Sequence, residues 1–266
     1  MKNKLLFILF FSIQFIFNSN TFCEVQKYSD SSKTMNFSFL RDTIYTFHTF
    51  YIEVNLSIQK AFLHSKDGTV KEFGVSSGTD KLQDGINTKE GLFVIQAKLP
   101  KWYSRQFDST LMLNWMGFNF GIGFHALPTS GYYRFLGKSK SSHGCLRISR
   151  AMAKELYKEI DIGTPVLVHS GNNAITISFI DSSKNFYEYS FRELHKTLEI
   201  RLKQMYRGNY FIGEKQPIII DKFNVSHVGL PIGDSRKILK RQIIKSSYEF
   251  IESVIPEVKK LMVILE

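Results

Sequence analysis

Cys145 is the residue of this sequence best suited to chemistry, because the only other cysteine, Cys23, lies close to the amino-terminal apolar run. A thiol attacks carbonyl groups as its thiolate, and nearby imidazole or cationic side chains stabilise that charge. His143, Arg147 and Arg150 surround Cys145 in the sequence. Gly144 lacks a β-carbon, so the chain can turn tightly there and direct backbone amides at an oxyanion. The segment therefore predicts an acyl-transfer site with a depressed thiol pKa.

Other uses of Cys145 have to be weighed against this one. A lone cysteine is most often a small buried hydrophobe. Cys145 could also ligate zinc with His125 and His143, with His169 as a distant fourth ligand, although His-Gly-Cys is not a common zinc spacing. A papain-like protease would need a downstream histidine in a recognisable context. We expect a nucleophilic cysteine, with neither metal nor cofactor.

Sixteen residues separate His125 from the block Ser142-His143-Gly144-Cys145-Leu146-Arg147. This order resembles the signature of the L,D-transpeptidase catalytic domain (YkuD-type), a family of cysteine enzymes that remodel bacterial peptidoglycan. The resemblance extends over roughly residues 50 to 170. Residues 87–93 look like the family's threonine, proline, any, glycine turn, with Lys89 where proline is usual, and residues 162–168 look like its closing turn and strand.

The resemblance implies a mechanism in which His125 takes the proton of Cys145, with its ring oriented by a backbone carbonyl. The thiolate would attack the carbonyl that joins the third and fourth residues of a peptidoglycan stem peptide, and D-alanine would leave. The upstream His125, rather than His143, is therefore the expected base.

Other residues of the motif are expected to support this reaction. Backbone amides around His143, Gly144 and Cys145 would hold the oxyanion. Arg147 would bind a substrate carboxylate or brace the loop. Ser142 is grouped with the substrate-binding residues, although shaping the backbone is its expected contribution, and Tyr133 is a candidate lid residue over the substrate.

The fate of the acyl-enzyme is open at this point. An amine from a neighbouring stem, or from a wall-anchored protein, would give transfer, whereas water would make the protein an L,D-carboxypeptidase. A peptidoglycan-binding protein without activity is a further alternative, against which the intact Cys145 and His125 argue. A nucleic-acid partner is not expected, because the sequence has no recognition motif. The sequence makes no prediction of the protein's oligomeric state.

Charge is unevenly distributed along this chain of formal net charge +11. Residues 91–150 hold eight Lys or Arg against one acid, Asp108. This basic segment predicts attraction to anionic wall polymer and to peptide carboxylates. An acceptor amine would instead prefer acidic groups, of which the segment has only Asp108.

The amino terminus is typical of a secretory signal, predicted over residues 1–23. Two lysines precede the apolar run of residues 5–17, which is shorter than the ~20 residues of a membrane-spanning helix. We therefore expect export to the periplasm or cell envelope, with membrane association if Cys23 carries a lipid. Residues 24–49 are predicted to be a linker.

Residues 50–170 are predicted to form a mixed α+β, mostly β catalytic domain. Alternating apolar and polar residues indicate a half-buried strand at residues 52–56. A turn leads into a second predicted strand at residues 70–75, residues 92–97 are a further strand candidate, and residues 102–120 are ambiguous between loops and strands. After Cys145 the period becomes helical, with Ser149 placed to cap the helix.

Residues 171–266 are predicted to form a smaller α+β accessory domain, whose expected task is to cover or extend the substrate groove. Ser190 and Glu193 form a capping-box pair before a helix that ends near residue 207. Residues 218–220 indicate a buried strand, and residues 239–254 an amphipathic stretch. With 43% hydrophobic residues, the chain can build a sizeable core.

Overall fold

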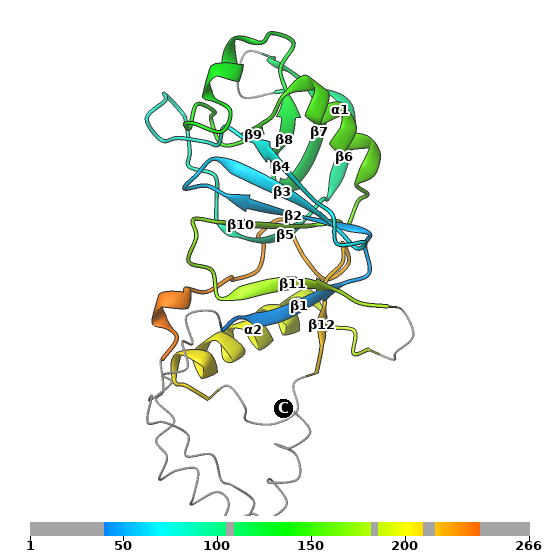
Figure 1. Ribbon diagram of the computed structural model, residues 1–266, viewed down its shortest axis with the longest axis vertical. Helices are drawn as coiled ribbons and strands as arrows, with labels where there is room; N and C mark the ends of the chain where they lie inside the picture. Colours follow the sequence, from blue (N-terminus) through cyan, green and yellow to red (C-terminus); the bar gives the residue numbers. More distant parts are fainter. Residues whose placement is uncertain (1–39, 105–108, 182–185, 210–215, 240–266) are drawn as a thin grey trace, which may run out of the picture. The chain divides into compact units, whose positions relative to one another are not determined.

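The computed structural model describes residues 40–104, 109–181, 186–209 and 216–239, which all belong to one compact unit (Figure 1). The predicted signal at residues 1–23 lies outside these ranges, as does the carboxyl-terminal amphipathic stretch beyond residue 239. Among the described residues, no helix is both long and apolar enough to cross a bilayer.

A five-stranded sheet occupies the middle of the molecule, in the order β4-β3-β2-β10-β5. Its outer strands pair antiparallel, and β10 runs parallel to β2 at its centre. The strands are β2 (Phe50–Asn55), β3 (Lys60–Ser65), β4 (Val70–Gly74), β5 (Gly91–Val94) and β10 (Pro165–His169).

A second sheet, in the order β6-β7-β8-β9, packs on one face of the first together with helix α1 (Figure 1). The strands of this sheet are β6 (Ala97–Tyr103), β7 (Leu111–Asn119), β8 (Ile122–Ala126) and β9 (Leu146–Arg147). Helix α1 spans Arg150–Glu159, and a 3-10 helix spans Gly131–Phe135. The residues that were ambiguous in the sequence are thus largely the β6–β7 hairpin.

The core between these two sheets is aliphatic and aromatic. Phe93, Phe118 and Phe124 are fully buried there, and the Phe118 ring packs against the rings of both Phe93 and Phe124. Leu146 and Leu156 join the same core from β9 and α1. This packing places the segment around Cys145 on top of a rigid layer.

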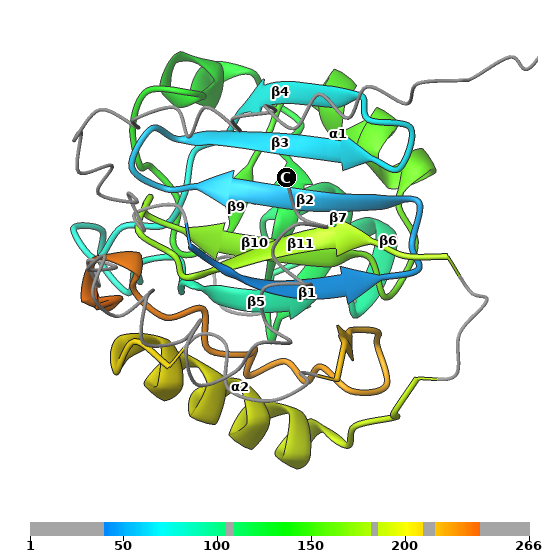
Figure 2. The same ribbon diagram turned by 60° about the horizontal axis from the view of Figure 1, so that its bottom comes forward.

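A third sheet, in the order β11-β1-β12, covers the other face of the central sheet, and helix α2 packs with it (Figure 2). Its elements are β1 (Asp42–Thr46), β11 (Ile175–Phe179), β12 (Ile218–Ile219) and α2 (Phe191–Tyr206), followed by a 3-10 helix at Ser235–Lys237. The core here includes Leu92, Val94 and Leu167 of the central sheet.

The linker predicted for residues 24–49 is corrected at its end, because residues 42–46 form β1. Ile44 of this strand is fully buried, and the strand pairs parallel with both β11 and β12. These partners lie more than a hundred residues downstream, so no local pattern could reveal the pairing.

The helix starts agree with the capping signals. The Ser149 hydroxyl accepts a hydrogen bond from the Met152 amide at α1, and Ser190 and Glu193 form the reciprocal capping box at α2. The mostly β architecture with a helix after Cys145 is confirmed. The single strand predicted at residues 92–97 is instead two strands, because Ile95 bonds to Thr164 whereas Gln96 bonds to Gly117 in the next sheet.

Candidate active site

The pairing of β8 with β9 explains how two segments 20 residues apart meet. The strands run parallel, with Phe124 opposite Leu146 and His125 opposite Arg147. Phe124 and Leu146 are fully buried in the core. Side chains alternate along a strand, so His125, Arg147 and the preceding Cys145 face away from the core.

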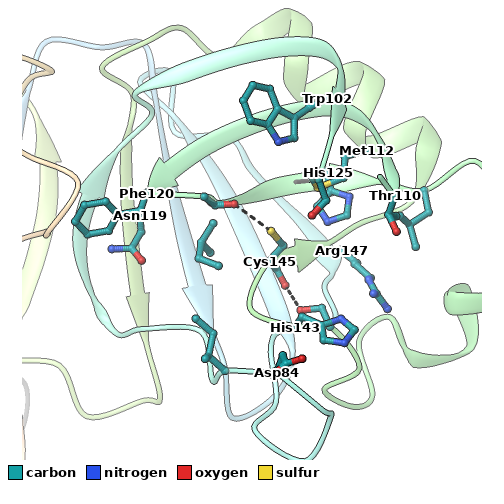
Figure 3. A pocket seen from close by; sticks show the side chains of 16 residues that line it. Asp84, Trp102, Thr110, Met112, Asn119, Phe120, His125, His143, Cys145 and Arg147 are labelled. Carbon is teal, nitrogen blue, oxygen red and sulfur yellow. Dashed lines mark hydrogen bonds between the residues drawn. The ribbon is translucent and has the colours of Figure 1, made fainter. Parts of the chain in front are cut away.

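These side chains line a cavity of about 470 Å³. Figure 3 shows Cys145 near its middle, with His125 and His143 from different segments around it. The described residues that line it are Asp84, Ile86, Trp102, Ser104, Thr110, Met112, Asn119, Phe120, Gly121, Ile122, His125, Leu127, Ser142, His143, Cys145 and Arg147. Five of the seven predicted site residues therefore share one cavity.

Cys145 is partly buried, and its Sγ lies 3.6 Å from the Gly121 carbonyl oxygen, to which the thiol donates (Figure 3). Burial raises the pKa of this thiol to about 11, and the nearby Arg147 charge opposes the shift only in part. The depressed pKa expected from the basic segment is therefore wrong, because desolvation of the thiolate outweighs the cation.

His125 is almost fully buried, and its Nδ1 lies 3.2 Å from the Ala126 carbonyl oxygen. This contact is the ring-orienting backbone carbonyl that the sequence led us to expect. Burial lowers the pKa of His125 to about 4, so the imidazole is neutral at physiological pH. Cys145 and His125 thus rest as a thiol and a neutral imidazole, and not as an ion pair.

Alkylation of Cys145 by iodoacetamide is expected to accelerate about ten-fold for each pH unit from about pH 7 to 9, because only the thiolate reacts and its fraction rises by that factor below the pKa. The rate is measured by mass spectrometry on the peptide that contains Cys145. Free cysteine in the same tube should level off first, since its pKa is lower. A rate for Cys145 that is flat across this window would mean that a stable thiolate exists and would contradict the neutral pair.

Ser142 shapes the loop that carries Cys145. Its hydroxyl accepts from the Gly144 amide at 3.1 Å and donates to the Cys145 carbonyl oxygen. Ser142 thus positions the backbone, the contribution expected of it, and it also lines the cavity. The Gly144 amide is already engaged, so it is not available to an oxyanion. Gly144 itself has a φ of +144°.

Thr88 and Gly78, whose contribution the sequence did not reveal, hold the loop from the other side. The Thr88 hydroxyl donates to the Gly144 carbonyl oxygen at 2.6 Å and accepts from the Gly78 amide at 2.9 Å. A β-carbon at Gly78 would lie 2.4 Å from the Gly144 Cα. Close backbone approach therefore requires glycine at position 78, and only the three-dimensional contact identifies it.

Arg147 braces the same loop. Its Nη1 donates to the Ser141 carbonyl oxygen at 2.8 Å, while its Nε is buried with no partner among the described residues. Of the two roles predicted for Arg147, bracing is the one with a direct contact.

Tyr133 does not line the cavity, which corrects its assignment as a substrate-binding lid residue. Its hydroxyl accepts from the Arg150 amide at 2.8 Å, at the start of α1. The neighbouring Tyr132 donates to the Ile148 carbonyl oxygen at 2.7 Å. Both tyrosines thus anchor the 3-10 helix to the strand and helix that follow Cys145.

Two cavity residues are held by the chain after residue 170. The Asn119 side chain donates to the His227 carbonyl oxygen at 2.6 Å, and the Phe120 ring stacks on the His227 ring at 5.6 Å between centroids. Leu230 pairs with Leu92 of β5 through two backbone hydrogen bonds. The carboxyl-terminal segment thus supports one rim of the cavity.

The zinc alternative does not fit the geometry. His169 lies on the central sheet, where its Nε2 is 2.9 Å from the Glu53 carboxylate. Among the described residues, no group of three His, Cys, Asp or Glu side chains is arranged to hold a metal ion.

Known proteins that are similar to this chain belong to the family whose signature His125 and residues 142–147 resemble. Residues 49–168 match the family model of the L,D-transpeptidase catalytic domain, YkuD. The predicted resemblance is thereby confirmed over this region. A curated relative, "Putative L,D-transpeptidase YciB" of Bacillus subtilis, is 26% identical over 127 residues, which cover 44% of this chain and 64% of YciB.

Solved structures of L,D-transpeptidases are also similar to this chain. One from Mycobacterium smegmatis is 22% identical, with a TM-score of 0.40 over 46% of this chain and 58% of that chain. One from Stackebrandtia nassauensis is 25% identical, with a TM-score of 0.39 over 46% of this chain and 55% of that chain. The chain thus spans little more than half the length of these structures.

Proposed function

We propose that this protein is an exported cysteine acyltransferase that acts on peptidoglycan stem peptides, an L,D-transpeptidase with Cys145 as its nucleophile. The observation that carries the proposal is that Cys145 and His125 line one cavity within the region that matches the L,D-transpeptidase catalytic domain. Export to the periplasm or cell envelope is part of the proposal and rests on the amino-terminal apolar run.

The protonation of the two resting side chains supports a proton transfer from Cys145 to His125. His125 is neutral and its Nδ1 faces the Ala126 carbonyl, so Nε2 carries the lone pair that accepts the thiol proton. Because burial disfavours the thiolate, the proton leaves Cys145 as the sulfur attacks the substrate carbonyl. The neutral pair is thus a base and a nucleophile, and charge develops on His125 only as the sulfur bonds to the substrate carbonyl.

The first half of the reaction forms a thioester. Cys145 Sγ bonds to the carbonyl carbon between the third and fourth stem residues, and the oxyanion is held by the Cys145 amide, since the Gly144 amide is engaged by Ser142. His125 returns its proton to the leaving nitrogen, and D-alanine departs. The acyl group stays on Cys145.

The second half decides the product. An amine that attacks the thioester gives transfer, and water gives L,D-carboxypeptidase activity, which is the alternative function. An acceptor from a neighbouring stem or from a wall-anchored protein serves the same chemistry. Cys145 and His125 share one cavity, and this disfavours an inactive peptidoglycan-binding protein.

Incubation of the protein with defined tetrapeptide muropeptides, followed by mass spectrometry, tests the proposal. Cross-linked dimers and released D-alanine are the expected products. Tripeptide muropeptides alone would assign the alternative carboxypeptidase, and unchanged muropeptides would contradict both.

A further inference from the structure

We propose that Asp84 binds the ammonium group of the acceptor and thereby favours amine transfer over hydrolysis. The inference rests on the proposed function and names the acceptor class of that site, a cationic amine. Its starting point is charge: among the sixteen described residues that line the cavity, Asp84 is the only acid.

Asp84 lies in the same cavity as Cys145 but on a different segment. In Figure 3, Asp84 and Trp102 lie at opposite ends of the cavity, with Cys145 between them. Arg147, which lines the same cavity, is a cation suited to carboxylates of the donor peptide. Separate acidic and basic positions around one sulfur suit a reaction that joins an anionic donor to a cationic acceptor.

The Asp84 segment is fixed to the loop that carries Cys145. The Thr79 amide donates to the Ser142 carbonyl oxygen at 2.9 Å, and the Ile86 amide donates to the His143 carbonyl oxygen at 3.3 Å. Asp84 lies between these two attachments. The backbone at Asp84 is therefore held close to the loop that carries Cys145, and the exposed Asp84 side chain projects from this fixed turn.

The Asp84 carboxylate is available to a ligand. It makes no hydrogen bond or ion pair with any other residue that the structure describes, whereas Glu53 binds two histidines and Asp234 binds Arg236. Its φ is +56°, a left-handed conformation in which aspartate and asparagine are among the better tolerated non-glycine residues. Asparagine can therefore replace Asp84 without backbone strain.

The chemistry of the second half-reaction explains why a carboxylate helps. An aliphatic amine is an ammonium ion at neutral pH, and a nearby carboxylate attracts it into a cavity that otherwise holds the Arg147 cation. The ammonium loses one proton to solvent before attack. The amine nitrogen then bonds to the acyl carbon as the carbon–sulfur bond breaks, and its second proton passes through His125 to the sulfur, which restores the thiol.

The test compares Asp84→Asn with the wild-type protein in the presence of a tetrapeptide muropeptide donor and one of two small acceptors. Glycinamide is largely cationic at pH 7, whereas hydroxylamine is uncharged. The ratio of transfer product to hydrolysis product is expected to fall about five-fold with glycinamide, the effect of a single exposed ion pair, and to stay at the wild-type ratio with hydroxylamine. Asp80→Asn, in the same exposed segment but outside the cavity, serves as the matched control and should leave both ratios unchanged.

Equal ratios for Asp84→Asn and wild type with glycinamide would overturn the assignment of Asp84, with the acyltransferase function intact. A parallel loss with both acceptors would also overturn it, because the effect would then not depend on charge. If the wild-type protein releases no D-alanine from the donor, the proposed function itself fails, and the inference fails with it.

Discussion

Replacing Cys145 with alanine is expected to reduce product formation by about 10⁴-fold or more, since removal of a catalytic nucleophile leaves only the contribution of binding and of the oxyanion donors. No other side chain of the cavity can form the thioester, because Cys145 is the only free cysteine among the described residues. The measurement is the rate of D-alanine release from a tetrapeptide muropeptide, followed for wild type and variant at equal concentration.

The variant should keep its fold, because the Cys145 side chain is only partly buried and alanine removes a single sulfur atom. An unchanged circular dichroism spectrum and melting temperature establish this. Product at a rate comparable to wild type, from a folded Cys145→Ala protein, would rule out the cysteine mechanism.

Replacing His125 with alanine is expected to lower the rate of D-alanine release by about 10³-fold, within the range typical of general-base catalysis. The same change at His143 should cost less than about ten-fold. The difference follows from their environments: His125 is buried with Nδ1 on the Ala126 carbonyl, which leaves Nε2 for the thiol proton. His143 is partly exposed at the cavity wall.

Because His125 is buried, its variant needs a control for stability. His125→Gln preserves more of the side-chain volume but cannot accept and return a proton in the same way, so it should be nearly as slow as His125→Ala with a smaller loss of melting temperature. A larger loss of rate for His143→Ala than for His125→Ala, in folded proteins, would transfer the base role to His143.

Local chemistry explains the parts of the fold that the sequence could predict. Ser149, Ser190 and Glu193 satisfy backbone groups of their own helices, so the starts of α1 and α2 are encoded within a few residues. In contrast, β1 forms because Ile44 is buried between partners far along the chain. Pairing of that kind depends on the whole core, so the linker predicted for residues 24–49 is wrong at residues 42–46.

The site also combines features that the sequence could predict with features that depend on distant contacts. The resemblance to the L,D-transpeptidase signature implied that His125 and Cys145 lie in one site, and the parallel pairing of β8 with β9 brings both to one cavity. The pKa of Cys145 could not be predicted in this way, since burial raises it by more than the neighbouring Arg147 charge lowers it. Asp84 was also missed, because only a contact between backbone segments brings it to the cavity.

The contribution of Gly78 and Thr88 to the site could not be predicted from the sequence either. Their contacts with Gly144 join segments that are more than fifty residues apart, and neither residue type signals catalysis. Their contribution is to position the loop that holds Cys145.

The measurement that tests the central claim most directly is the intact mass of the protein after incubation with a carbapenem, whose strained carbonyl is an acyl donor for a reactive thiol. We expect the mass to increase by one carbapenem per chain, with the adduct on the peptide that contains Cys145 and with no increase in Cys145→Ala. An unchanged mass after prolonged incubation, or an adduct on another residue, would contradict the assignment of Cys145 as the nucleophile of this cavity.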